Sequence, residues 1–332
     1  MEGGTRMTGM IVESEFKPQS FWWRNRHVQT IVPNVFFPRP KLELRRERLE
    51  LPDGDFIDVD WTTGATGPIV VVLHGLEGSV RSRYAWNIMR RIHGMGMRAA
   101  LPHFRDCSGE PNRLAIGYHS GFTQDLEYFT GLLKQREPET PLAAVGYSLG
   151  GNVLLKWLGE SPNASRLTTG VAVSVPFDLA DCSAAIERGL SRLYMRDFMG
   201  RMRRSARRKF ARVKSPIPLP DLDKLRTFRQ FDDAMTAPLH GYKDADDYYA
   251  RASSKPVLKH IKVPTLVVHA KDDPFMSPRV VPTAEELSPS IRFELSELGG
   301  HVGFIDGPTF KPRRWVDQRI TRHLQAHLPA KD

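Results

Sequence analysis

Gly146-Tyr147-Ser148-Leu149-Gly150 is the stretch of this 332-residue chain that decides its fold. An apolar run that begins at Leu142 precedes it, as in a buried strand, and a helical pattern follows at 151–158. A serine in such a tight strand-to-helix turn adopts strained backbone angles, and its flanking glycines avoid collision with neighbouring backbone. The hydroxyl group then lies at a helix N-terminus, which favours negative charge. The pattern therefore predicts Ser148 as a nucleophile.

Strand and helix patterns alternate on both sides of this turn. Buried strands are expected at 68–73, 98–101, 142–147, 168–175, 265–269 and 291–295, and helices at 83–94, 121–135, 151–158 and 313–327. Upstream, two strand-like segments at 42–51 and 56–61 flank Asp53-Gly54, which is a hairpin signal. This alternation predicts one α/β domain over residues 1–332, with a mostly parallel central sheet and helices on both faces.

Two segments depart from the alternation. Residues 1–40 contain prolines at 18, 33, 38 and 40, which predicts an irregular arm lying on the body. Residues 176–264 predict a helical, lid-like insertion. Within it, 188–214 holds eleven Lys or Arg residues and one acid, with apolar residues at helical spacing. Two interpretations stay open for this basic helix: its apolar side packs on the protein, or it contacts an anionic membrane surface.

Composition narrows the class of protein. The net charge is +10, but no signature of a nucleic-acid-binding module accompanies it, so nucleic acid is not expected as a partner. Cys107 and Cys182 are too few for a disulfide scaffold, which favours a reducing, cytoplasmic setting. The apolar runs are too short to span a bilayer. Metal- and nucleotide-binding motifs are absent from the sequence, so no metal or cofactor is expected.

A serine hydroxyl needs a base to remove its proton and an acid to orient that base. His301 lies in the glycine-rich segment 299–303, after the last predicted strand, where a loop can reach Ser148. The acid is expected at the end of the preceding strand, where Asp272 and Asp273 are adjacent. Asp273 is favoured, because the residue before such a proline usually points back across the sheet edge in similar enzymes. Asp272 is the alternative, and Asp178 a third candidate.

An ester-cleaving serine also needs backbone N–H groups for the oxyanion. One is expected from Leu149, directly after the nucleophile, and the other from Leu76 in the loop His74-Gly75-Leu76-Glu77. His74 itself is interpreted as a structural residue that holds this loop.

These segments together resemble the YheT-like branch of the α/β hydrolases, which is related to the animal ABHD lipases and esterases. The resemblance rests on motifs in order along the chain at 25–30, 53–56, 61, 74–79, 107–109, 146–152, 272–275 and 300–304. It implies hydrolysis of small-molecule or acyl-lipid esters, with Ser148, His301 and an acid from the Asp272-Asp273 pair. Asp106 departs from the pattern, because similar proteins usually carry glycine between the arginine and the cysteine. We expect this departure to reshape the loop locally.

Two alternatives to an ester hydrolase remain at this stage. An acyltransferase would pass the acyl group to a thiol or alcohol in place of water. A non-catalytic lipid-binding protein could share the fold, but the presence of Ser148, Asp273 and His301 together argues against it.

Overall fold

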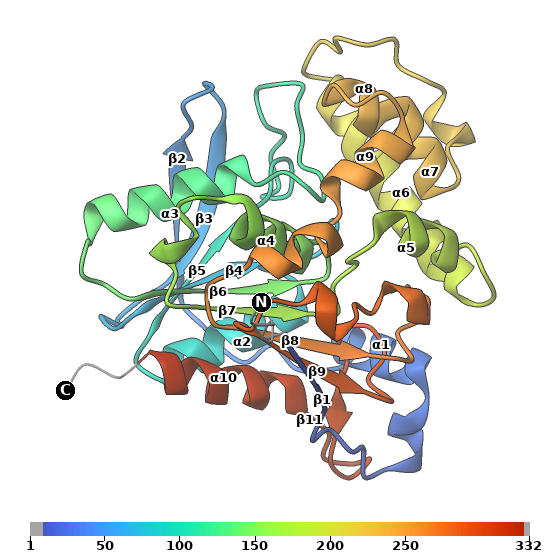
Figure 1. The fold of residues 1–332 in the computed structure, drawn as a ribbon. Coiled ribbons are helices and arrows are strands. Elements are labelled where there is room, and N and C mark those ends of the chain that lie inside the picture. The colour runs from blue at the N-terminus through green and yellow to red at the C-terminus, as the bar shows by residue number, and fades with distance from the viewer. Residues whose placement is uncertain (1–8, 329–332) are drawn as a thin grey trace, which may run out of the picture.

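The computed structural model describes residues 9–328, and its strands form one nine-stranded sheet in the order β1-β9-β8-β7-β6-β4-β5-β3-β2 (Figure 1). The strands are β1 Met10–Glu13, β2 Leu44–Glu50, β3 Phe56–Thr62, β4 Ile69–Leu73, β5 Arg98–Pro102, β6 Leu142–Tyr147, β7 Thr169–Val173, β8 Thr265–Ala270 and β9 Ile291–Ser296. Neighbouring strands pair in parallel except where β3 pairs with β2 and β5. A small antiparallel pair, β10 Ile305–Asp306 and β11 Arg313–Arg314, lies apart from this sheet.

Helices cover both faces of the sheet because its strands are apolar on both sides. On one face lie α3 Gln124–Arg136 and α4 Leu149–Glu160, and on the other α2 Arg83–Gly94 and α10 Trp315–His327 (Figure 1). Along β4, Val71 packs into the core under α3 and α4, whereas Val70 and Val72 pack into the core with α2 and α10. The prediction of a mostly parallel α/β sheet with helices on both faces is confirmed.

The insertion at 176–264 connects β7 to β8 and is mainly helical. Its helices are α5 Leu179–Ile186, α6 Ser191–Phe210, α7 Phe228–Phe231, a π-helical turn at Asp232–Thr236, α8 Ala237–Leu239 and α9 Ala245–Ala252. They lie together to one side of the sheet (Figure 1). Short 3-10 turns complete the described helices, at Phe21–Arg24, Ala164–Arg166, Leu222–Lys224, Lys255–His260, Pro278–Val280 and Ala284–Glu286.

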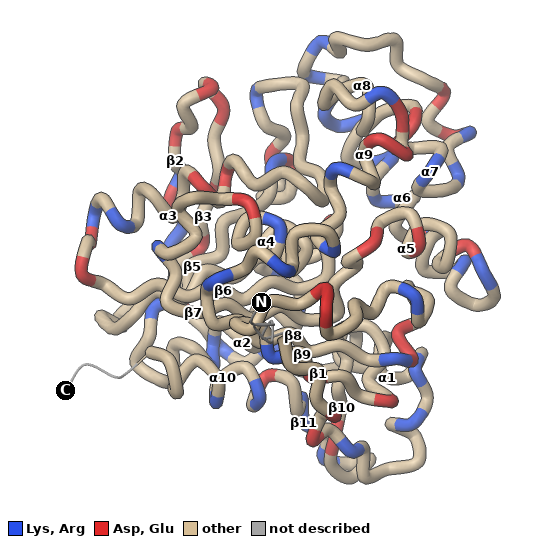
Figure 2. The backbone as a smooth tube through the Cα atoms, in the orientation of Figure 1, with Lys and Arg blue, Asp and Glu red and all other residues tan. Residues whose placement is uncertain are grey.

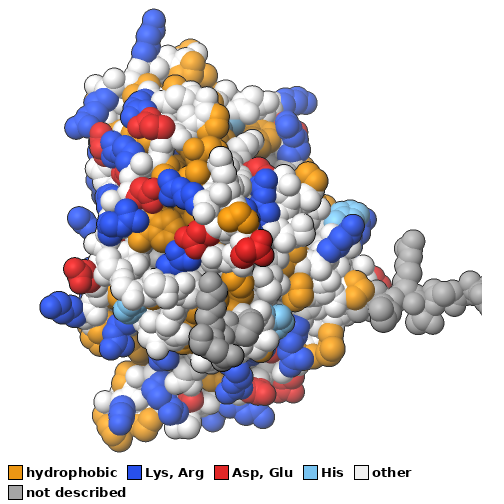
Figure 3. Space-filling model, turned by 90° about the vertical axis from the view of Figure 1, so that its left-hand side faces the viewer, with side chains coloured by type: hydrophobic (Ala, Val, Ile, Leu, Met, Phe, Trp, Pro, Cys, Tyr) orange, Lys and Arg blue, Asp and Glu red, His pale blue; other side chains and the backbone are white. Residues whose placement is uncertain are grey.

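The basic helix α6 buries its apolar side within the protein. Met195, Met199 and Ala206 are buried in a cluster with Ile186 and Met235 of the same insertion. Most of its arginines are exposed. Lys and Arg residues are spread along the whole chain (Figure 2). On the face shown in Figure 3 they are scattered among acidic and apolar side chains. The structure contains no helix, within the described residues, that is long and apolar enough to cross a membrane.

The N-terminal arm is more regular than its prolines suggest, so the prediction of an irregular segment is wrong for much of it. Residues 1–8 lie outside the described part, but β1 adds a parallel edge strand beside β9. Helix α1, Arg26–Val35, begins where the Asn25 side chain accepts hydrogen bonds from the N–H groups of His27 and Val28. Pro33 lies inside α1 and removes one backbone donor without ending the helix.

Candidate active site

Ser148 lies at a strained turn between β6 and α4. Its φ of 52° and ψ of −120° lie in a region that side-chain-bearing residues rarely adopt. The backbone leaves no space for a side chain at the flanking glycines. A Cβ atom would lie 2.5 Å from the Gly150 oxygen if placed on Gly146, and 2.5 Å from the His74 oxygen if placed on Gly150. Glycine is therefore required at both positions for the turn that presents Ser148.

The structure brings Ser148, His301 and Asp273 into one chain of contacts. The Nε2 atom of His301 lies 3.0 Å from the Ser148 Oγ, and its Nδ1 atom lies 2.7 Å from the Asp273 Oδ2. The Asp273 side chain is buried, with 1% of it exposed, and its other oxygen accepts from the Phe275 N–H. A carboxylate at Nδ1 holds the imidazole with Nε2 free to accept the serine proton.

The two neighbouring aspartates diverge at the end of β8. The Asp272 Oδ1 accepts a hydrogen bond of 2.9 Å from the Gly300 N–H. Burial raises the pKa of Asp272 to about 6. Asp178 instead begins α5, where its side chain accepts from the Asp181 N–H. Of the three candidate acids, Asp273 is the one that contacts His301.

The N-terminal arm positions the His301 loop, which the sequence had not indicated. The His301 N–H donates to the Thr30 Oγ1 at 3.0 Å, and the Gln29 side chain bonds both the N–H and the oxygen of Ile305. A Cβ atom on Gly303 would lie 2.3 Å from the Gln29 oxygen, so helix α1 packs directly on the loop. Asn25 before an apolar pattern was the available sign of this helix.

Leu76 and Leu149, the two residues whose backbone N–H groups are predicted to bind the oxyanion, line the same cleft as Ser148. For neither group does any residue in 9–328 serve as an acceptor. The loop before Leu76 is held in place because the Gly75 N–H donates to the Tyr84 hydroxyl at 2.8 Å. His74 also holds it, through contacts with the Gly75 oxygen and the Phe104 N–H. Burial lowers the pKa of His74 to about 3, so its imidazole is neutral.

A cleft opens at Ser148 and runs beneath the insertion. It encloses about 810 Å³ of space, including its open mouth. Its lining is mainly apolar and comes from the insertion and the strand-end loops, including Leu179, Ile186, Phe198, Met202 and Met276. No group of three or more His, Cys, Asp or Glu side chains among the described residues is arranged to hold a metal ion.

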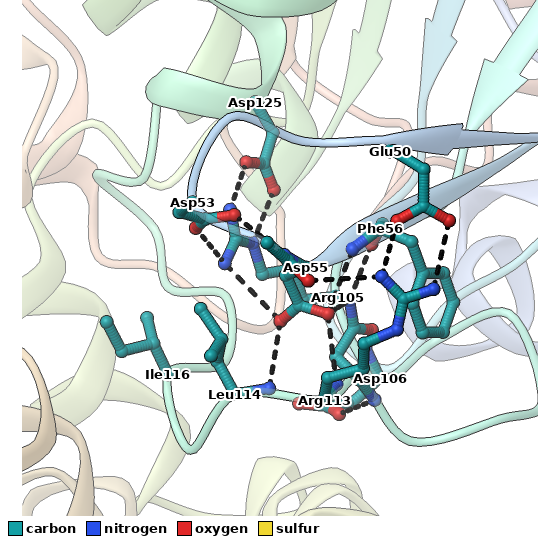
Figure 4. A network of polar contacts seen from close by, with 12 residues as sticks. Glu50, Asp53, Asp55, Phe56, Arg105, Asp106, Arg113, Leu114, Ile116 and Asp125 are labelled. Carbon is teal, nitrogen blue, oxygen red and sulfur yellow. Dashed lines mark hydrogen bonds and ion pairs between the residues drawn. The ribbon is translucent and has the colours of Figure 1, made fainter.

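Arg105 and Asp106 connect the loop after β5 to the rest of the molecule. Arg105 is buried, with ion pairs to Asp125 at 2.7 Å and to Asp53 at 2.8 Å (Figure 4). Asp106 has a φ of 69°, a conformation that favours glycine, in agreement with the glycine that the resemblance implies at this position. Its carboxylate pairs with Lys209 of α6 at 2.9 Å, and 4% of the Lys209 side chain is exposed. Asp106, which departs from the family pattern, therefore joins the insertion to the body through its ion pair with Lys209.

This sheet order, with a serine at a strained strand-to-helix turn, defines the α/β-hydrolase class. A family model described as alpha/beta hydrolase fold matches residues 68–308. The chain is 44% identical over 324 residues to YheT of Escherichia coli (strain K12), named as a candidate esterase, covering 96% of this chain and 95% of that protein. The chain belongs to the α/β-hydrolase family, in its YheT-like branch.

More distant proteins agree with this placement. The mouse Phospholipase ABHD3 is 27% identical, with 95% of this chain and 79% of that protein covered. Among solved structures, the esterase Pf2001 of Pyrococcus furiosus has the same fold, with a TM-score of 0.58 and 16% identity over 98% of this chain and 99% of that chain. The chain is thus an esterase-like α/β hydrolase.

Proposed function

We propose that this protein is a serine hydrolase that cleaves carboxylic esters through an acyl-serine intermediate. The observation that carries the proposal is the chain of contacts from Ser148 through His301 to Asp273. In the first half-reaction, the Ser148 oxygen attacks the ester carbonyl carbon while His301 Nε2 takes the serine proton. His301 then gives this proton to the leaving alkoxide, and the acyl group stays on Ser148.

Water completes the reaction. His301 removes a proton from a water molecule as its oxygen attacks the acyl carbon, and the proton returns to Ser148 when the carboxylic acid leaves. In both halves the oxyanion accepts hydrogen bonds from the Leu76 and Leu149 N–H groups, which are fixed before the substrate arrives. Asp273 stabilises the imidazolium that forms each time, because it is buried against Nδ1.

The apolar cleft supports an acyl-lipid or other small ester as substrate. Names of similar proteins point the same way: besides the candidate esterase, they include a phospholipase and a yeast Monoacylglycerol lipase. We further infer that the arginines on the outer side of α6 contact anionic phospholipid surfaces. This contact would be electrostatic, because the apolar side of α6 is packed on the protein.

Two measurements on the intact chain test the proposal. Wild-type protein should hydrolyse p-nitrophenyl esters and should react with a fluorophosphonate probe at Ser148. Ser148→Ala should lower kcat by a thousandfold or more and abolish labelling, with little change in thermal stability, since the serine contributes chemistry more than packing. Near-wild-type turnover by Ser148→Ala would remove this serine from the mechanism.

A further inference from the structure

A buried carboxyl group lies in the wall of the same cleft as Ser148, and the proposed mechanism gives it no part. Asp232 begins the π-helical turn of the insertion and lines the cleft, with 8% of the residue exposed. Turns of this rare type occur frequently at functional sites. No Lys, Arg or His among residues 9–328 forms an ion pair with it.

Asp232 is the centre of a polar patch. Its Oδ1 accepts from the Thr236 hydroxyl at 2.7 Å and its Oδ2 from the Tyr249 hydroxyl at 2.8 Å. The Tyr249 hydroxyl also lies 3.2 Å from the Ser183 Oγ. All four side chains line the cleft, and we call them the Asp232 patch: Ser183, Asp232, Thr236 and Tyr249. Burial raises the pKa of Asp232 to about 7.

The neighbouring acid, Asp233, shows what a purely structural aspartate does in this turn. Its Oδ1 accepts from the Ala245 N–H at 2.7 Å at the start of α9, and it pairs with Arg229. Within the described part of the chain Asp232 has no comparable backbone partner, since both of its hydrogen bonds there come from side-chain hydroxyls. Burying a carboxyl group is unfavourable unless further donors satisfy it, and each carboxyl oxygen can accept more than one hydrogen bond. This capacity is available to a ligand in the cleft.

The arrangement of the cleft indicates which part of the ester reaches the patch. A second groove also ends at Ser148 and His301, but charged side chains of both signs border it, including Arg39, Arg81, Arg201, Glu77 and Asp197. A charged, hydrated groove suits the departing alcohol, whose hydroxyl group is polar. The apolar cleft suits the acyl chain, which stays attached to Ser148 until water releases it.

We propose that the Asp232 patch is a specificity subsite for a hydroxyl group carried on the acyl chain of the substrate. This assignment rests on the proposed esterase function and deepens it. A hydroxyl group can donate to Asp232 and accept from the Ser183 hydroxyl at the same time, whereas the Thr236 and Tyr249 hydroxyls already donate to Asp232. An ammonium group can only donate, and it would lose its hydration in an apolar cleft without a second carboxylate.

The test uses matched p-nitrophenyl esters, with acyl chains of graded length ending in either a methyl or a hydroxyl group. At the chain length that reaches the patch, wild-type kcat/KM should favour the hydroxylated ester by about tenfold to a hundredfold, as expected for a hydrogen bond to a charged or partly charged group. Asp232→Leu should abolish this preference, so that kcat/KM for the hydroxylated ester falls to the value for the methyl-ended ester of the same length. Asp233→Asn, the matched control in the same turn, should keep the preference.

Other outcomes overturn the assignment. No preference at any chain length, or equal loss of both activities in a folded Asp232→Leu protein, would leave Asp232 a structural residue. If Asp232→Leu does not fold, Asp232→Asn replaces it, and an undiminished hydroxyl preference in that variant would count against the proposal. Stronger preference for an amino-ended ester, which presents an ammonium group, would overturn the choice of a hydroxyl group. If wild-type protein hydrolyses no ester and Ser148 is not labelled, the esterase proposal fails and this subsite with it. Normal hydrolysis without a preference refutes the subsite alone.

Discussion

The Ser148 turn and the insertion above it are held in place by different kinds of interaction. The turn is held by contacts between backbone atoms. The Ser148 N–H donates to the Val173 oxygen at 2.9 Å, and Gly150 lies against the His74 oxygen. Over the cleft, α6 is joined to the body by side chains. Ser205 donates to Glu77 at 2.7 Å, and Lys209 pairs with Asp106.

This difference determines how much the sequence of each region can vary. A turn fixed by backbone contacts tolerates few residue types, so its geometry is shared with other proteins of the fold. An insertion fixed by individual side chains can change its contacts without disturbing the sheet. We therefore expect the chemistry to lie at the strand ends and the selection of the substrate to lie in the insertion.

The largest expected effect lies at the strand ends. Asp273→Asn should lower kcat by about 10⁴, because an amide at Nδ1 no longer favours the imidazole tautomer that accepts the serine proton. Steady-state hydrolysis of a p-nitrophenyl ester measures this, with circular dichroism to verify the fold.

Asp272→Asn is the matched control for that variant. An asparagine oxygen can still accept the Gly300 N–H, so the His301 loop should keep its position and kcat should change far less. If Asp272→Asn had the larger effect, Asp272 would be the acid of the site. If both effects were mild, neither would orient His301 and Asp178 would have to be reconsidered.

An intermediate effect is expected where the insertion joins the body. Lys209→Met should lower the free energy of unfolding by about 3 kcal/mol, because it leaves the partly buried Asp106 carboxylate without its ion-pair partner. Urea denaturation measures the loss. The double variant Asp106→Gly, Lys209→Met should recover most of it, since glycine tolerates the φ of 69° at this position. Equal losses in the single and double variants would show that the ion pair does not join the two regions.

The sequence was informative where local patterns dictate structure. The buried strand before Ser148, its glycines and the alternating elements around it predicted the sheet and the turn. Residue pairs that meet only in the folded chain were not predictable in this way. β1 pairs with β9, although most of the chain separates the two strands in sequence. Thr30, which accepts a hydrogen bond from the His301 N–H, belongs to an arm whose prolines suggested irregular structure. The place of Asp232 in the cleft wall was not predictable for the same reason, because the folded insertion creates the cleft around it.

The smallest expected effect concerns the outer side of α6, which carries exposed arginines, whereas Met195, Met199 and Ala206 of the same helix are buried against the insertion. Each exposed arginine that engages an anionic membrane contributes about 1 kcal/mol, and about 1 M salt shortens the screening length to about 3 Å. Co-sedimentation should therefore show weak binding to anionic vesicles at low salt, none to zwitterionic vesicles, and loss of binding at high salt.

The double variant Arg192→Glu, Arg196→Glu should abolish the binding to anionic vesicles, because both side chains are exposed on α6. Arg90→Glu, an exposed arginine on α2, changes the net charge elsewhere and should lower binding far less. Equal, negligible binding to both vesicle types at low salt would mean that the basic side of α6 serves solubility or the packing of the insertion. Binding that survives high salt would instead require apolar contact, for which the exposed Leu190 and Leu193 near the start of α6 would be the residues to replace next.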